Sequence, residues 1–151
     1  MTKIATLLLL ALVAVFAYLY WQNSQAPELG VVNGKFKPLS DKPNCVSTQT
    51  DVEEKRVEPF AAKENLVATM AAIKGAIENY GYGTAKIELE SNAYVYASFT
   101  TPTMKWVDDV EFWVDEKSKI VHFRSSSRAG YSDRGLNRQR YDELKKIYAN
   151  L

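Results

Sequence analysis

The residues best suited to chemistry are arginines gathered in one stretch. Residues 124–140 hold five of the chain's six arginines and one acidic residue, Asp133, whereas the thirteen lysines are scattered. Arginine presents a rigid planar fork that binds a carboxylate or a phosphate through two parallel hydrogen bonds, while lysine is a mobile point charge. The concentration of arginine therefore predicts a region of defined geometry that holds anionic groups.

Two interpretations of this stretch are open. In the first, Gly130 and Gly135 make a pliable loop before a helix whose free N–H groups attract negative charge, and the arginines clamp an anionic ligand. In the second, the arginines are internal braces that pair with nearby aspartates and fix the loop. Mixed use also fits, because three nearby aspartates cannot neutralise five arginines. The candidate ligand-binding residues are Arg124, Arg128, Asp133, Asn137 and Arg138, supported by Asp108, Asp109, Glu111 and His122.

Catalytic and metal-binding alternatives draw on the same region. A thiol enzyme would use Cys45 as nucleophile, His122 as base, and Asp109 or Glu111 to orient the base. The sequence leaves the separation of Cys45 and His122 open, and a lone cysteine is commonly a small packed residue. A metal site would recruit the acids and His122, but Asp108 and Asp109 point to opposite faces of a strand, and nearby arginines repel a cation. We expect no metal and no cofactor.

Aromatic residues offer a further possibility. They could line a groove for a glycan or a lipid, but aromatic residues at alternating strand positions also pack beneath helices or stack on one another. Both interpretations stay open for Tyr94, Tyr96, Trp106, Trp113 and Tyr131.

Two helices and four strands are expected to position these side chains. Apolar residues recur with helical spacing over residues 62–80, and a second helix is expected over residues 138–150, capped by Asn137. Four β-rich runs with the spacing of hairpins lie between the helices, at residues 85–90, 94–100, 107–114 and 120–125. This order predicts an α+β domain in which two helices pack on one face of a four-stranded antiparallel meander.

The last hairpin has a predictable buried face. Apolar residues alternate with polar ones along both of its strands, so the apolar set must share one face of the sheet. We expect five residues to be buried together: Val110, Phe112, Val114, Val121 and Phe123.

The opposite face of this hairpin is polar. A two-residue turn at Glu116–Lys117 would place Asp109 opposite Arg124 and Glu111 opposite His122. A register two residues longer also brings acids beside His122 and Arg124. In both registers the acids and the first arginine share one polar surface.

The N-terminus carries an uncharged apolar run, Ile4–Trp21. Its eighteen residues extend about 27 Å as a helix, most of a hydrocarbon layer of about 30 Å. Lys3 precedes the run and the next basic residue is Lys35, which keeps the N-terminus cytoplasmic. We expect a transmembrane anchor, or an uncleaved signal, over residues 1–21, a linker over 22–42 and one α+β domain over 43–151. The alternative is a signal peptide cleaved after Ala26.

Overall charge and cysteine content exclude some classes of protein. Lysine and arginine total 19 against 18 acidic residues, a near-balance that argues against a nucleic-acid partner. Cys45 is the only cysteine, so the chain forms no intrachain disulfide.

Four strings of the sequence resemble one known family. They are PNCVST at Pro43–Thr48, FTTP at Phe99–Pro102, VDDVEF at Val107–Phe112 and RSSSRAGYSDRGLNRQR at residues 124–140. Together they are similar to the domain of unknown function family DUF1499, over about Pro43 to the C-terminus. The resemblance implies a bacterial envelope or plastid protein, often with an N-terminal hydrophobic segment. It implies no activity, cofactor or catalytic residue.

From these observations we expect a non-enzymatic module of the cell envelope. It would be a single-pass protein of a bacterial inner membrane, anchored through residues 4–21, with its domain in the periplasm. Its partner would be an anionic small molecule, a lipid head group or an envelope protein, bound through the arginine-rich stretch. The alternatives are an interaction scaffold with internal arginine braces, and a hydrolase or thiol enzyme that uses His122 and nearby acids.

Overall fold

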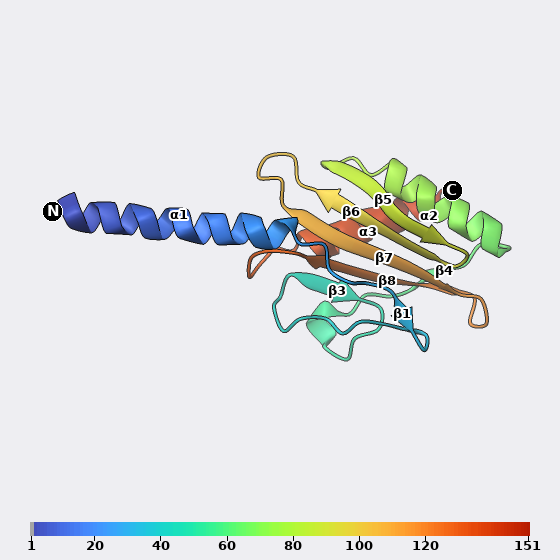
Figure 1. The fold of residues 1–151 in the computed structure, drawn as a ribbon. Helices are drawn as coiled ribbons and strands as arrows, with labels where there is room; N and C mark the ends of the chain where they lie inside the picture. Colours follow the sequence, from blue (N-terminus) through green and yellow to red (C-terminus); the bar gives the residue numbers. More distant parts are fainter. Residues whose placement is uncertain (1) are drawn as a thin grey trace.

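The structure is a computed structural model that describes residues 2–151. Within that range, three helices, eight strands and one 3-10 turn follow one another along the chain (Figure 1). The helices are α1 (Thr2–Ser24), α2 (Leu66–Glu78) and α3 (Leu136–Ala149), and the 3-10 turn is η1 (Glu53–Lys55). The strands are β1 (Val31–Val32), β2 (Lys35–Phe36), β3 (Cys45–Ser47), β4 (Phe60–Ala61), β5 (Thr84–Ser91), β6 (Tyr94–Thr100), β7 (Val107–Asp115) and β8 (Ile120–Ser127).

The main sheet has six strands, so the prediction of a four-stranded sheet was wrong. β5, β6, β7 and β8 form the expected antiparallel meander, and β3 and β4 each pair with β8 along its other edge. The two additional strands have only three and two residues, too few for an alternating pattern to be read from the sequence. The prediction of a mixed α+β fold with antiparallel strands is confirmed.

One apolar core lies between the sheet and the helices α2 and α3. Phe60 of β4 is central to it, because its ring contacts Phe112 and Phe123 of the sheet and Tyr141 and Tyr148 of α3. The burial predicted for one face of β7 and β8 is confirmed for all five residues: Val110, Phe112, Val114, Val121 and Phe123.

The second face of the sheet is also covered. Glu111 is 0% exposed and Asp109 is 1% exposed, although both lie on the face that the sequence predicted to be polar. The β1–β2 hairpin crosses this face, and a Cβ at Gly34 would lie only 3.3 Å from the Trp113 ring. Residues 22–42, for which we expected a linker, therefore carry a hairpin that contacts the sheet.

The pairing of β7 with β8 is shifted by two residues from the register that a two-residue turn would give. Glu111 lies opposite Arg124, whereas the two-residue turn would have placed it opposite His122. A four-residue turn follows Asp115, whose carboxylate accepts hydrogen bonds from the residues of the turn. The turn ends at Lys119 with a φ of +55°. Of the two registers that the sequence left open, the structure has the longer one, and the hydrogen bonds to Asp115 stabilise its four-residue turn.

Helix α1 is long and apolar enough to cross a membrane, by length and composition alone. It extends away from the domain, and its C-terminal end meets the loop between β6 and β7 (Figure 1). The Tyr20 ring stacks on Trp106 with centroids 5.0 Å apart. The Asn23 side chain donates to the Lys105 carbonyl (2.9 Å) and accepts from the Val107 N–H (2.8 Å). These contacts fix the direction of α1 relative to the sheet.

Candidate functional site

Arg124 lies on β8 and pairs with a fully buried carboxylate. Its Nη1 donates to Oε2 of Glu111 at 2.9 Å. Oε1 of Glu111 accepts two further hydrogen bonds, from the Tyr94 hydroxyl (2.8 Å) and from the Gly30 N–H (2.9 Å). Nε of Arg124 is buried without a hydrogen-bond partner among the described residues. Glu111 therefore joins β8, β6 and the segment before β1, and Arg124 supplies the charge that balances it.

Arg128 is held in the same way at the end of β8. Its Nε and Nη2 bind the Asp109 carboxylate bidentately, with contacts of 2.9 and 2.7 Å, and Nη2 also donates to the Tyr96 hydroxyl. The hydrogen bonds to Asp109 raise the pKa of Arg128 above its ordinary value. Burial, followed by the hydrogen bond to Asp109, raises the pKa of Tyr96. The guanidinium thus stays charged and binds groups of its own chain.

A third ion pair lies on the helix-covered face of the sheet. Nη2 of Arg140 donates to Oδ2 of Asp108 at 2.6 Å, and both side chains are almost completely buried. Nη1 donates to Oδ1 of Asn137 at 2.9 Å, and the guanidinium lies over the rings of Tyr80 and Phe99. Sequence reasoning did not select Arg140, because a buried arginine and a ligand-binding arginine look alike in the sequence.

Asn137 and Asp133 organise the start of α3. The helix begins one residue before Asn137, with Gly135 in the cap position at a φ of +81°, so the prediction of Asn137 as the cap was wrong. The Asp133 carboxylate accepts hydrogen bonds from the N–H groups of Gly135 and Asn137 (3.0 and 2.7 Å), so it caps the N-terminal end of the helix. The Asn137 side chain points inward and donates to the Asn44 carbonyl (3.0 Å).

Arg138 lies on the first turn of α3 and also finds partners within the chain. Its Nη2 donates to the carbonyl oxygens of Glu54 and Arg56 at 2.9 and 3.0 Å. The three arginines predicted to clamp a ligand therefore all bind groups of the chain itself. This geometry is that of the brace interpretation.

The other predicted combinations are not brought together. Cys45 lies opposite Ser126, and His122 lies four residues earlier on β8, about 13 Å away along a strand. The Cys45 thiol is buried and donates to the Lys42 carbonyl at 3.3 Å. Three of the acids considered for a metal site, Asp108, Asp109 and Glu111, pair with three different arginines, and Asp133 accepts from N–H groups of Gly135 and Asn137. Across residues 2–151, no group of three or more His, Cys, Asp or Glu side chains could hold a metal ion.

His122 is expected to make stability depend on pH. Its ring stacks on Trp113 and its Nδ1 lies 3.0 Å from the Thr48 hydroxyl. Burial lowers the pKa of His122 below its ordinary value of about 6.5, although Asp115 partly opposes the shift. The unfolded chain therefore binds a proton at a higher pH than the folded chain, so stability falls as the pH drops below about 6.5. Urea unfolding at pH 7.5 and 5.5 should show this loss in the native protein and a smaller loss in His122→Phe. An equal loss in both proteins would contradict it.

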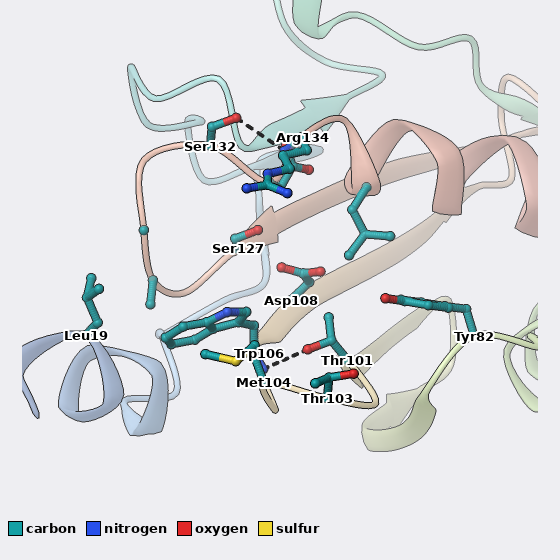
Figure 2. A pocket seen from close by; sticks show the side chains of 14 residues that line it. Leu19, Tyr82, Thr101, Thr103, Met104, Trp106, Asp108, Ser127, Ser132 and Arg134 are labelled. Carbon is teal, nitrogen blue, oxygen red and sulfur yellow. Dashed lines mark hydrogen bonds between the residues drawn. The ribbon is translucent and has the colours of Figure 1, made fainter. Parts of the chain in front are cut away.

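Arg134 differs from the other arginines of the stretch. Its side chain makes no hydrogen bond or ion pair with any residue in the described part of the chain. Its backbone has a φ of +56°, and its N–H donates to the Ser132 hydroxyl at 3.2 Å. This turn presents the guanidinium toward a cavity (Figure 2).

The cavity, which we call the Arg134 cavity, has a volume of about 500 Å³. It lies between the end of α1, the β6–β7 loop and the β8–α3 loop. Figure 2 shows Leu19 at one end, Tyr82 at the other, and Trp106 and Met104 between them. The polar lining includes Arg134, Ser127, Ser132, Asp108 and Asp133. Both aspartates already bind groups of the chain, so Arg134 is the unpaired charge of this cavity.

Of the residues named from the sequence, Asp108, Asp133 and Trp106 line this cavity, but Arg134 was not among the candidate ligand-binding residues. Leu19, Tyr82 and Met104 lie far from the stretch in sequence, and only folding brings them to it. The excess of arginines over nearby acids was the available signal, because it left some arginines without an acidic partner.

The comparisons with known proteins give a family and no activity. No curated protein matches the chain, and no solved structure matches it. Residues 35–147 match the family described as protein of unknown function (DUF1499), which agrees with the resemblance of the four strings. Because the match covers well over half of the chain, this protein belongs to the DUF1499 family.

Proposed function

We propose that the protein is a membrane-anchored, extracytoplasmic binding module without catalytic activity, which takes an anionic ligand in the Arg134 cavity. The observation that carries the proposal is the unpaired guanidinium at this cavity, beside apolar walls. Arg124, Arg128 and Arg138 then act as braces that hold the strands and the loop in place. Arg134, which does not act as a brace, is the arginine that binds the ligand.

The junction between α1 and the domain supports a retained anchor. Cleavage after Ala26 would remove Asn23, whose side chain satisfies the Lys105 carbonyl and the Val107 N–H. It would also remove the ring that stacks on Trp106. With Lys3 before the apolar segment, the proposed topology is a cytoplasmic N-terminus and a periplasmic domain at a bacterial inner membrane.

The proposal is tested with phenyl phosphate, a soluble anion with an apolar ring. Calorimetric titration of the full chain in a neutral maltoside detergent should show binding to the native protein and about tenfold weaker binding to Arg134→Gln, because one charge-assisted hydrogen bond is lost. Arg56→Gln removes the same charge at a site outside the cavity, where Nε binds the Thr50 carbonyl, and should leave the affinity unchanged. Absence of binding, or equal affinity in all three proteins, would overturn the proposal.

A further inference from the structure

The depth of the Arg134 cavity relative to a membrane follows from the contacts of α1. The apolar run Ile4–Trp21 extends about 27 Å, so its aromatic end lies at the boundary of a hydrocarbon layer of about 30 Å. Tyr20, at this end, donates a hydrogen bond to the Met104 carbonyl (3.3 Å) and stacks on Trp106. The β6–β7 loop is therefore held at the depth of the lipid head groups, where tyrosine and tryptophan are favoured.

The cavity is continuous with the lipid-facing surface of α1. Leu19 belongs to the apolar segment and also lines the cavity, together with Met104 and Trp106. Figure 1 shows the β6–β7 and β8–α3 loops on either side of the point where α1 meets the domain. Met104 and Tyr131, one on each loop, are 40% and 72% exposed. A lipid beside α1 would thus meet apolar surface from the helix to the interior of the cavity.

The charges at this end of the domain fit a phosphate. Arg134 is unpaired, and Lys105 is an exposed cation on the β6–β7 loop. The nearby carboxylates are already satisfied: Asp108 by Arg140, and Asp133 by N–H groups of α3. A guanidinium beside an apolar wall matches a molecule that joins a phosphate to acyl chains.

We propose that the occupant of the Arg134 cavity is a phospholipid of the leaflet around the C-terminal end of α1. Its phosphate lies at Arg134, and its glycerol and upper acyl carbons lie against Trp106, Met104 and Leu19. This inference rests on the proposed function and adds the chemical class of the ligand and its lateral route into the site. The domain then binds a lipid of the same membrane in which α1 is anchored.

The experiment follows lipid retained by the full chain. Protein reconstituted with phosphatidylglycerol is extracted into neutral detergent, and native mass spectrometry measures the bound lipid. The native protein and Arg56→Gln should retain one lipid, and Arg134→Gln should retain about tenfold less. Leu19→Trp fills the membrane-facing end of the cavity, so it should also lose the lipid.

Three outcomes separate the lipid inference from the proposed function. Loss of lipid in both Arg134→Gln and Leu19→Trp supports the inference. If phenyl phosphate binds through Arg134 but lipid retention is the same in all variants, the ligand is a soluble anion and the lipid inference is wrong. If neither probe depends on Arg134, both proposals are wrong.

Discussion

Asp108→Leu is expected to lower the free energy of unfolding by about 3–5 kcal/mol, because it leaves a buried guanidinium without its counter-charge. Arg140 is 1% exposed, and Asp108 is its only acidic partner in the described structure. For a domain of this size the melting temperature should fall by on the order of 15 °C. Arg140→Met, which leaves the carboxylate unpaired, should have a similar effect. Thermal and urea unfolding of the full chain in neutral detergent measure both.

The double variant Asp108→Leu/Arg140→Met gives the sharper result. It removes both charges and leaves two apolar side chains beside the Tyr80 and Phe99 rings, so most of the lost stability should return. Asp142→Leu is the matched control, since Asp142 is exposed on the same helix as Arg140 and should change stability by less than about 0.5 kcal/mol. If Asp108→Leu is no more destabilising than this control, the pair does not brace the fold.

The sequence predicts the strands of the meander and their buried face because those features are local. Val110 and Phe112 alternate with polar residues, and a nine-residue strand is long enough for this two-residue period to be recognised in the sequence. β4 has only two residues, although its Phe60 is central to the core. Its place depends on pairing with Val121, far away in the sequence, which no local pattern reports.

Which arginines are paired could not be predicted from the sequence either, because their partners come from distant parts of the chain. Arg128 and Arg134 lie six residues apart in one loop region, and both have small residues as chain neighbours. Arg128 is paired because β6 and β7 bring Tyr96 and Asp109 beneath it. Arg134 is free because its turn directs it toward the end of the domain, where the acids are already satisfied. The concentration of arginine predicted that this region would bind anionic groups. Which arginine has guanidinium N–H groups without a partner depends on the tertiary structure.

Burial of Glu111 was also beyond local reasoning. Its strand face reads as polar, and the hairpin that covers it comes from residues 31–36, about eighty positions earlier. Two registers were compatible with the alternation, since both keep the same residues inside. The longer turn decides that Arg124 is the residue that faces Glu111.

Glu111→Gln is expected to destabilise the domain by about 3 kcal/mol, because Arg124 would remain buried without a counter-charge. The loss should also have a local component. Without the carboxylate, the Gly30 N–H loses a strong acceptor and the hairpin of residues 31–36 is held less firmly. Unfolding in urea measures the first effect, and the rate of tryptic cleavage at Lys35 measures the second. Glu116→Gln, in the exposed turn between β7 and β8, should change neither.

The double variant Glu111→Leu/Arg124→Met separates this pair from the one in the core. Removal of both charges should restore little stability here, because the Tyr94 hydroxyl would still be buried without an acceptor, at about 1–3 kcal/mol, and the half-buried Gly30 N–H would lose its acceptor too. Addition of Tyr94→Phe removes one of these donors and should recover part of that loss. Full recovery in the double variant would show that Glu111 serves only to balance Arg124. Partial recovery in the triple variant would show that this carboxylate holds the N-terminal hairpin to the sheet.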